Sequence, residues 1–128
     1  MINEIELQSS FEDLIGQPIA VSLLEAALFK NRLAPAYLFY GPNGVGRKLA
    51  ALRFIEEIIK KNSSKLKVRK KLEDRNHPDL LWIEPTYQHQ GKPIAKSLAK
   101  KEGIKSKSPP QIRLEQIREI SRFLGKKP

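Results

Sequence analysis

One glycine-rich segment contains the residues of this chain whose types and spacing could do chemistry: Gly41-Pro42-Asn43-Gly44-Val45-Gly46-Arg47-Lys48. Its GxxxxG spacing is that of a Walker A loop, in which backbone N–H groups and the start of the next helix surround the phosphates of a nucleotide. The motif needs a buried strand before the glycines and a helix after them. The segment is therefore a candidate nucleotide-binding loop, and the alternative is a glycine turn that only caps a helix.

The last two positions of this loop depart from the usual GK[ST] ending. Arg47 replaces the phosphate-binding lysine and keeps its charge, but a planar guanidinium is not a compact ammonium. Lys48 replaces the hydroxyl that ligates Mg²⁺, and an ammonium has no lone pair to offer a metal. We therefore expect no ATP hydrolysis, no catalytic residue, no required cofactor and at most weak ATP binding.

Hydrophobic patterns predict the elements that must position this loop. Apolar residues at helical spacing predict helices over about 18–32, 47–61 and 114–124. The short apolar runs at 36–40 and 80–83 suit strands buried on both faces, as in a parallel sheet. The order of strand, glycine turn, helix and strand indicates one α/β domain over residues 1–128, with a parallel sheet flanked by helices.

Positive charge is concentrated in the middle of the chain. The 128 residues carry 24 Lys+Arg against 14 Asp+Glu, a net charge of +10, and residues 60–107 hold 14 of those basic residues and only 5 acids. We predict two basic insertions: a loop or exposed helix at about 60–76, and a long loop at about 86–110. Four lysines of the first insertion are candidate contacts to DNA phosphates, with a solvated surface as the alternative: Lys65, Lys67, Lys70 and Lys71.

Composition and spacing give no support to several other chemistries. The chain has no cysteine, which excludes disulfides and thiolate zinc sites. Its two histidines, His77 and His89, do not make a metal-binding set, so we expect no metal. The adjacent acids Glu56 and Glu57 point apart on a helix and are predicted to face solvent. No apolar run is long enough to span a bilayer and the first residues do not resemble a signal peptide, so we expect a cytoplasmic protein.

Four segments, in order, resemble the N-terminal AAA+ domain of delta-prime subunits in bacterial DNA polymerase III clamp loaders: FEDLIGQPIAVSLLEAAL, RLAPAYLFYGPNGVGRKLAALRFIE, HPDLLWIEP and QIRLEQIREI. The resemblance covers most of residues 11–125 and implies a P-loop NTPase fold. It also implies that residues 41–48 border the phosphates of a nucleotide, and that Ile15, Gly16 and Tyr37 border its adenine.

The same resemblance implies a function in DNA replication. Delta-prime subunits often have a degenerate loop and form a non-hydrolysing part of the clamp-loader ring, and Arg47 and Lys48 fit that pattern. The implied partners are the gamma/tau and delta subunits, primer-template DNA and, indirectly, the sliding clamp, with no membrane. The arginine-finger motif and the lid and collar domains of the family are expected beyond Pro128. Many family members carry a four-cysteine zinc module after the Walker A helix, and this chain lacks those cysteines.

Two other functions stay open at this point. An ATP-hydrolysing P-loop ATPase of the clamp-loader type would need a magnesium ligand, which Lys48 does not provide. A basic nucleic-acid-binding module with no nucleotide role would not need the glycine turn. Both alternatives are therefore less favoured than a non-hydrolysing clamp-loader subunit.

Overall fold

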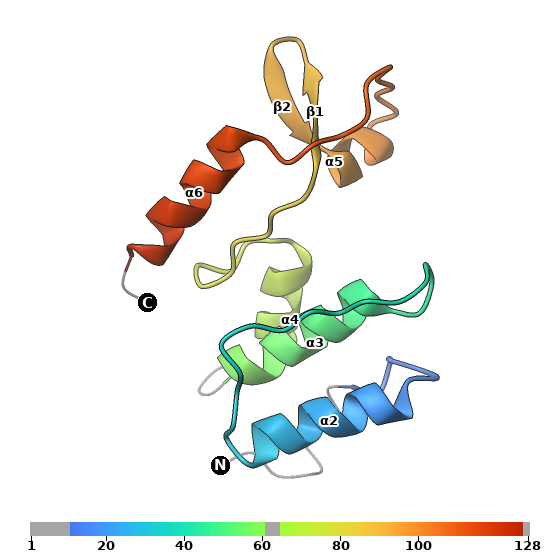
Figure 1. The fold of residues 1–128 in the computed structure, drawn as a ribbon, viewed down its shortest axis with the longest axis vertical. Helices are drawn as coiled ribbons and strands as arrows, with labels where there is room; N and C mark the ends of the chain where they lie inside the picture. The colour runs from blue at the N-terminus through green and yellow to red at the C-terminus, as the bar shows by residue number, and fades with distance from the viewer. Residues whose placement is uncertain (1–10, 61–64, 127–128) are drawn as a thin grey trace. The chain divides into compact units, whose positions relative to one another are not determined.

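The structure, a computed structural model, describes residues 11–60 and 65–126 (Figure 1). It forms two compact units, Met1–His77 and Pro78–Pro128. The described elements of the first unit are α2 (Pro18–Phe29), α3 (Arg47–Ile59) and α4 (Lys65–Glu73). Those of the second unit are β1 (Thr86–His89), β2 (Lys92–Ala95), α5 (Lys96–Lys101) and α6 (Leu114–Leu124).

Helix α3 is the centre of the first unit because it packs against both α2 and α4. Its contacts with α2 lie in an apolar cluster made of Phe11, Leu14, Leu24, Leu28, Ala50 and Phe54. On α4, Val68 and Leu72 are each only 2% exposed. Burial of these side chains holds the three helices together, since removing apolar surface from water is the main favourable term in folding.

The three predicted helices are confirmed as α2, α3 and α6. Helix α2 ends three residues before its predicted limit because Asn31 adopts a left-handed backbone conformation, with φ of 52°. The backbone N–H of Arg32 then bonds the carbonyl of Ala27 at 2.9 Å. Asparagine tolerates this conformation better than most residues, and the bond closes the end of the helix.

The strand predicted over residues 36–40 does not form. This segment runs alongside α3 (Figure 1), where the rings of Tyr37 and Phe39 lie edge-on to Phe54 with centroids 4.8 and 6.4 Å away. The alternate side chains of this segment, Leu38 and Tyr40, are each 85% exposed. A strand needs a hydrogen-bonded neighbour, and in the described part of the chain the two strands present pair with each other. Residues 80–83 form no strand for the same reason, so the predicted parallel sheet is not shown.

The second unit contains the only sheet of the described residues, an antiparallel hairpin in which Thr86 faces Ala95 and His89 faces Lys92. The two turn residues, Gln90 and Gly91, both have positive φ, at 51° and 76°. Two positive values are typical of the type I′ turn, whose twist matches that of a hairpin. The prediction of a long loop over 86–110 is therefore wrong, because a tight turn folds its first half into a hairpin and α5 follows directly.

Polar contacts around Thr86 join the hairpin to the start of α6. Thr86 is buried, and its N–H and carbonyl both pair with the backbone of Gln111, at 2.8 and 2.9 Å. The amide of Gln116 on α6 donates to the carbonyl of Glu84 at 2.8 Å and accepts from the Thr86 hydroxyl at 3.1 Å. These bonds fix the position of α6 within this unit, although no residue of α6 is itself buried.

Candidate phosphate-binding site

The glycine turn directly before α3 contains residues in the left-handed backbone conformation. Gly44 and Gly46 have φ of +88° and +92°, a region that glycine occupies without strain. A Cβ atom on Gly46 would lie 2.8 Å from Cδ1 of Leu14, which is too close for a real contact. Gly46 is also the N-cap of α3, and its carbonyl accepts the Ala50 N–H at 2.8 Å. The start of α3 therefore requires glycine at position 46.

A cavity of about 410 Å³ lies at the start of α3 and is lined by Phe39, Gly44, Gly46, Arg47 and Lys48. This volume is within the range of pockets that hold small ligands, roughly 300 to 1,000 Å³. The first turn of α3 has no acidic residue and its N-cap makes no side-chain cap bond. The N-terminal end of a helix attracts anions, and two basic side chains add to that field. The cavity suits a phosphate.

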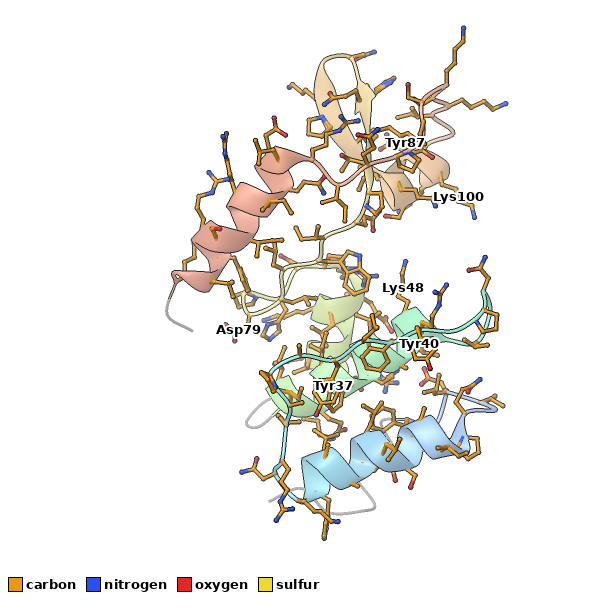
Figure 2. All side chains as sticks on the ribbon, in the orientation of Figure 1. Tyr37, Tyr40, Lys48, Asp79, Tyr87 and Lys100 are labelled. Atoms are coloured by element: carbon orange, nitrogen blue, oxygen red, sulfur yellow. The ribbon has the colours of Figure 1, made fainter. Side chains whose placement is uncertain are left out.

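The two residues that depart from the Walker A pattern both belong to this cavity. The guanidinium of Arg47 donates a hydrogen bond from Nη2 to Oδ1 of Asn43 at 2.9 Å, so it is turned back onto the loop itself. Lys48 projects from the first turn of α3 (Figure 2). Neither side chain offers a lone pair to a metal. Among the described residues there is no group of three or more side chains of the usual metal-binding types.

The structure brings together only part of the predicted site. Four residues of the 41–48 loop line the cavity, and Gly41, Pro42, Asn43 and Val45 do not. Ile15, Gly16 and Tyr37, predicted to border the adenine, are also outside the lining. Ile15 is 86% exposed, and the Tyr37 hydroxyl accepts the Ala34 N–H at 2.9 Å. Their role toward a nucleotide remains a prediction.

The prediction that Glu56 and Glu57 face solvent is wrong, because their side chains are fully buried in the first unit. Arg69 of α4 donates to both carboxylate oxygens of Glu56, from Nε at 2.7 Å and from Nη2 at 3.0 Å. Lys60 Nζ lies 2.8 Å from Oε1 of Glu57. Adjacent helical residues do point apart, but α3 has neighbours on more than one side, so both directions lead into protein.

A second ion pair, between the buried Arg53 and the partly exposed Asp13, joins α3 to the segment before α2. The Arg53 side chain is 7% exposed and donates to both oxygens of Asp13, with the shortest contact at 2.7 Å. Glu73 of α4 lies 3.4 Å away. The hydrogen bonds from Arg53 lower the pKa of Asp13 below its ordinary value of 3.8, although partial burial opposes this shift. The same bonds raise the pKa of Arg53. Together the ion pairs hold α3, and hence the glycine turn at its start.

Sequence reasoning missed these ion pairs although a signal was present. Arg53, Glu56 and Glu57 interrupt an otherwise apolar helix, and such residues are almost never fully buried unless they are paired. A basic helix that follows an apolar helix with acids could therefore have indicated pairing between the two.

The lysines proposed as DNA contacts lie on the outer side of α4. Lys67, Lys70 and Lys71 are exposed, whereas Val68 and Leu72 of the same helix are buried. The side chain of Lys65 lies outside the described residues. The helix therefore presents a basic face to solvent, and its apolar face covers α3.

These observations define the chain as a mixed α/β protein with a glycine turn and a candidate phosphate site at the start of a helix. A family model described as "DNA polymerase III, delta subunit" matches residues 16–128, which is most of the chain. The chain belongs to this family of DNA polymerase III clamp-loader subunits.

Several curated proteins are similar to short parts of the chain. Protein STICHEL of Arabidopsis thaliana is 50% identical over 44 residues, which cover 34% of this chain and 4% of that protein. DNA polymerase III subunit tau of Bacillus subtilis (strain 168) is 40% identical over 48 residues, or 38% of this chain and 8% of that protein. The chain thus spans less than a tenth of the length of these relatives. No solved structure matches it significantly.

No helix in residues 11–60 and 65–126 combines the length and the apolar character that crossing a membrane requires.

Proposed function

We propose that this chain is part of a non-hydrolysing, delta-prime-type subunit of the cytoplasmic DNA polymerase III clamp loader, which supports loading of the sliding clamp during replication. In this proposal the chain has an AAA+ P-loop fold. The parallel sheet of that fold is part of the proposal, since the strands of the described residues form only the antiparallel β1–β2 hairpin. Membership of the clamp-loader family supports the general role.

The chemistry of the loop carries the finer part of the proposal. Lys48 occupies the position where a hydrolysing loop needs a hydroxyl for Mg²⁺, and its charge repels that ion. Arg47, at the phosphate-lysine position, bonds Asn43 within the loop at 2.9 Å. That contact uses one of the five N–H donors of the guanidinium and turns the group toward the loop. Weak binding without hydrolysis is the behaviour that these two residues favour.

Exposed apolar residues support a role within an assembly. Helix α2 buries Leu24 and Leu28 in the core, yet Ile19 and Leu23 of the same helix are 78% and 68% exposed. Surface helices usually have a polar outer face, and one that is apolar all round is usually covered. We assign the outer side of α2 to contact with another clamp-loader subunit of the gamma/tau or delta type.

We also assign the exposed face of α4 to primer-template DNA. Lys67, Lys70 and Lys71 point to solvent and form no ion pair in the described part of the chain. Exposed lysines of this kind contact the phosphates of DNA and do not distinguish its base sequence.

Titration calorimetry with Mg-ATP tests the loop. The unmodified chain should bind ATP weakly or not at all, and the double variant Arg47→Lys/Lys48→Thr should bind it more tightly, because it restores the ammonium and the metal-binding hydroxyl. Each single variant is the control for the other. Sub-micromolar binding by the unmodified chain would contradict the proposal.

That outcome would favour a second candidate, an ATP-hydrolysing clamp-loader ATPase. Two observations keep this candidate open: the glycine turn has the left-handed residues that a phosphate loop uses, and a cavity of about 410 Å³ adjoins it. A separate test is co-purification of the chain with gamma/tau and delta subunits. Failure to associate would contradict the clamp-loader role whatever the result with ATP.

A further inference from the structure

The hairpin, α5 and the segment that follows α5 together make up residues 86–107, a small element with an unusual charge. It contains six lysines and one acid: Lys92, Lys96, Lys100, Lys101, Lys105, Lys107 and Glu102. All six lysines are exposed. None of them takes part in the ion pairs of the described residues, which involve Arg53, Lys60 and Arg69. The charge of this element is therefore accessible to a partner.

The element is held in shape by contacts that do not use its lysine side chains. Helix α5 packs against both strands of the hairpin, and Ala99 at its centre is fully buried. The backbone N–H groups of Lys96 and Ser97 bond the carbonyl of Pro85 at 2.9 Å and Oε1 of Glu84 at 2.7 Å. Glu84 also accepts from the Trp82 indole at 3.1 Å. Glu84, the nearest preceding acid, therefore helps to hold the start of α5 in place.

The spacing of the charges suits a row of anions better than a single one. Lys96 and Lys100 lie four residues apart, about 6 Å along the helix, and Figure 2 shows Lys100 on α5. Lys105 and Lys107 follow beyond Gly103, where positive φ turns the chain out of α5. Lysines spread along a segment in this way match the repeated phosphates of a nucleic-acid strand.

The tip of the hairpin is poorly suited to a membrane surface. The hairpin tip consists of Gln88, His89, Gln90 and Gly91, all exposed. Peripheral binding to a bilayer normally buries aromatic or aliphatic side chains beside the basic ones. The tip offers none.

We propose that residues 86–107 bind the phosphodiester backbone of DNA through their lysines, as a second contact surface separate from α4. This inference rests on the proposed clamp-loader function, which brings the chain to DNA. Binding is independent of sequence, because lysines contact phosphates and do not distinguish base edges well.

The test is fluorescence anisotropy of labelled primer-template DNA with the full chain, from about 50 to 200 mM salt. Replacing Lys96, Lys100 and Lys101 by Gln should flatten the log–log salt slope by up to about 2.7, at about 0.9 for each phosphate that the variant no longer neutralises. The matched control replaces Lys30, Arg32 and Lys126, three exposed basic residues outside both surfaces, and removes the same charge. It should change the slope by less than the amount expected for one phosphate, about 0.9.

A slope that changes equally in the two triple variants would overturn the proposal, since the effect would then come from net charge. So would loss of DNA binding only in a third triple variant, Lys67→Gln/Lys70→Gln/Lys71→Gln, or binding to phosphatidylglycerol vesicles without binding to DNA. Co-purification with gamma/tau and delta subunits is measured for the same variants. Normal association without DNA binding would separate failure of this inference from failure of the clamp-loader role.

Discussion

Helices α4 and α5 are both short and rich in lysine, yet the structure uses their charges differently. Helix α4 turns Arg69 inward to the buried carboxylate of Glu56 and buries Val68 and Leu72. Helix α5 buries one alanine, Ala99, and leaves every lysine in solvent. A count of basic residues treats the two segments as equivalent.

Basic charge therefore has two separate physical uses in these helices. A guanidinium facing a buried carboxylate forms bidentate hydrogen bonds and compensates the cost of desolvating both charges. An exposed ammonium contributes almost nothing to folding but attracts polyanions from solution. Substitutions of the inward-facing residues of α4, Val68, Arg69 and Leu72, should therefore mainly change stability, whereas substitutions of the exposed lysines of α4 and α5 should mainly change binding.

The largest effect is expected for Arg69→Ala, which leaves the fully buried Glu56 carboxylate without its bidentate partner. We expect a loss of about 3 to 5 kcal/mol in the free energy of unfolding of the first unit. Hydrogen exchange of peptides from α3 and α4 in increasing urea measures it. The control Lys70→Ala changes an exposed neighbour and should cost less than about 0.5 kcal/mol.

The double variant Glu56→Leu/Arg69→Met sharpens this test. Replacing both charges by apolar groups removes the desolvation cost together with the attraction, so the double variant should be much more stable than Arg69→Ala alone. Equal exchange rates for Arg69→Ala and Lys70→Ala would contradict the role given to the ion pair.

The next largest effect is expected from replacing a leucine by alanine, and it should differ between α4 and α5. Leu72→Ala in α4 removes a side chain that is 2% exposed and should cost about 3 kcal/mol. Leu98→Ala in α5 removes one that is 44% exposed and should cost less than about 1 kcal/mol. Exchange of peptides from each helix reports the two changes in stability separately. Equal losses of stability for Leu72→Ala and Leu98→Ala would contradict the conclusion that α4 is packed more tightly than α5.

A smaller effect concerns acid stability. The pKa of Asp13 is lower in the folded state because Arg53 donates hydrogen bonds to it. Ionised Asp13 therefore stabilises the fold above its unfolded pKa, near 3.8, and this contribution disappears as pH falls through the lower folded-state pKa. Asp13→Asn should lower stability near neutral pH by less than about 1 kcal/mol, because the side chain is partly exposed.

Urea unfolding between neutral pH and about pH 3 measures the acid effect. The Asp13→Asn chain should lose less stability than the unmodified chain as the pH falls, because it has no carboxyl to protonate at that position. The matched control is Asp74→Asn, which changes an exposed carboxyl just after α4. An identical fall in stability for the unmodified and Asp13→Asn chains would show that the Arg53 contact does not contribute.

The smallest effect on stability is expected for the exposed lysines. Replacing Lys67, Lys70 and Lys71 by Gln, or Lys96, Lys100 and Lys101 by Gln, should change the free energy of unfolding by less than about 0.5 kcal/mol per site. Thermal unfolding followed by circular dichroism checks both sets. A large loss in the second set would mean that the α5 lysines are structural, and would weaken their assignment to DNA.

Elements that depend on local pattern could be predicted from the amino-acid sequence. Apolar spacing places α2, α3 and α6 to within a few residues, and the glycines of the 41–48 loop place the turn before α3. These features are local because helix hydrogen bonds and left-handed glycine conformations involve residues only a few positions apart.

Burial and pairing, in contrast, became visible only in the folded chain. The burial of Glu56 depends on α4, whose Arg69 is 13 residues away in the chain. The strand predicted at 36–40 lacks a hydrogen-bonded neighbour, a condition that no local pattern expresses. The hairpin at 86–95 escaped prediction because its turn residues, Gln90 and Gly91, are not one of the Asn-Gly or Asp-Gly pairs that usually mark a hairpin. Strand pairing and burial depend on residues that are far apart in the chain. Whether a charged side chain forms a buried ion pair or faces solvent is therefore decided by tertiary packing.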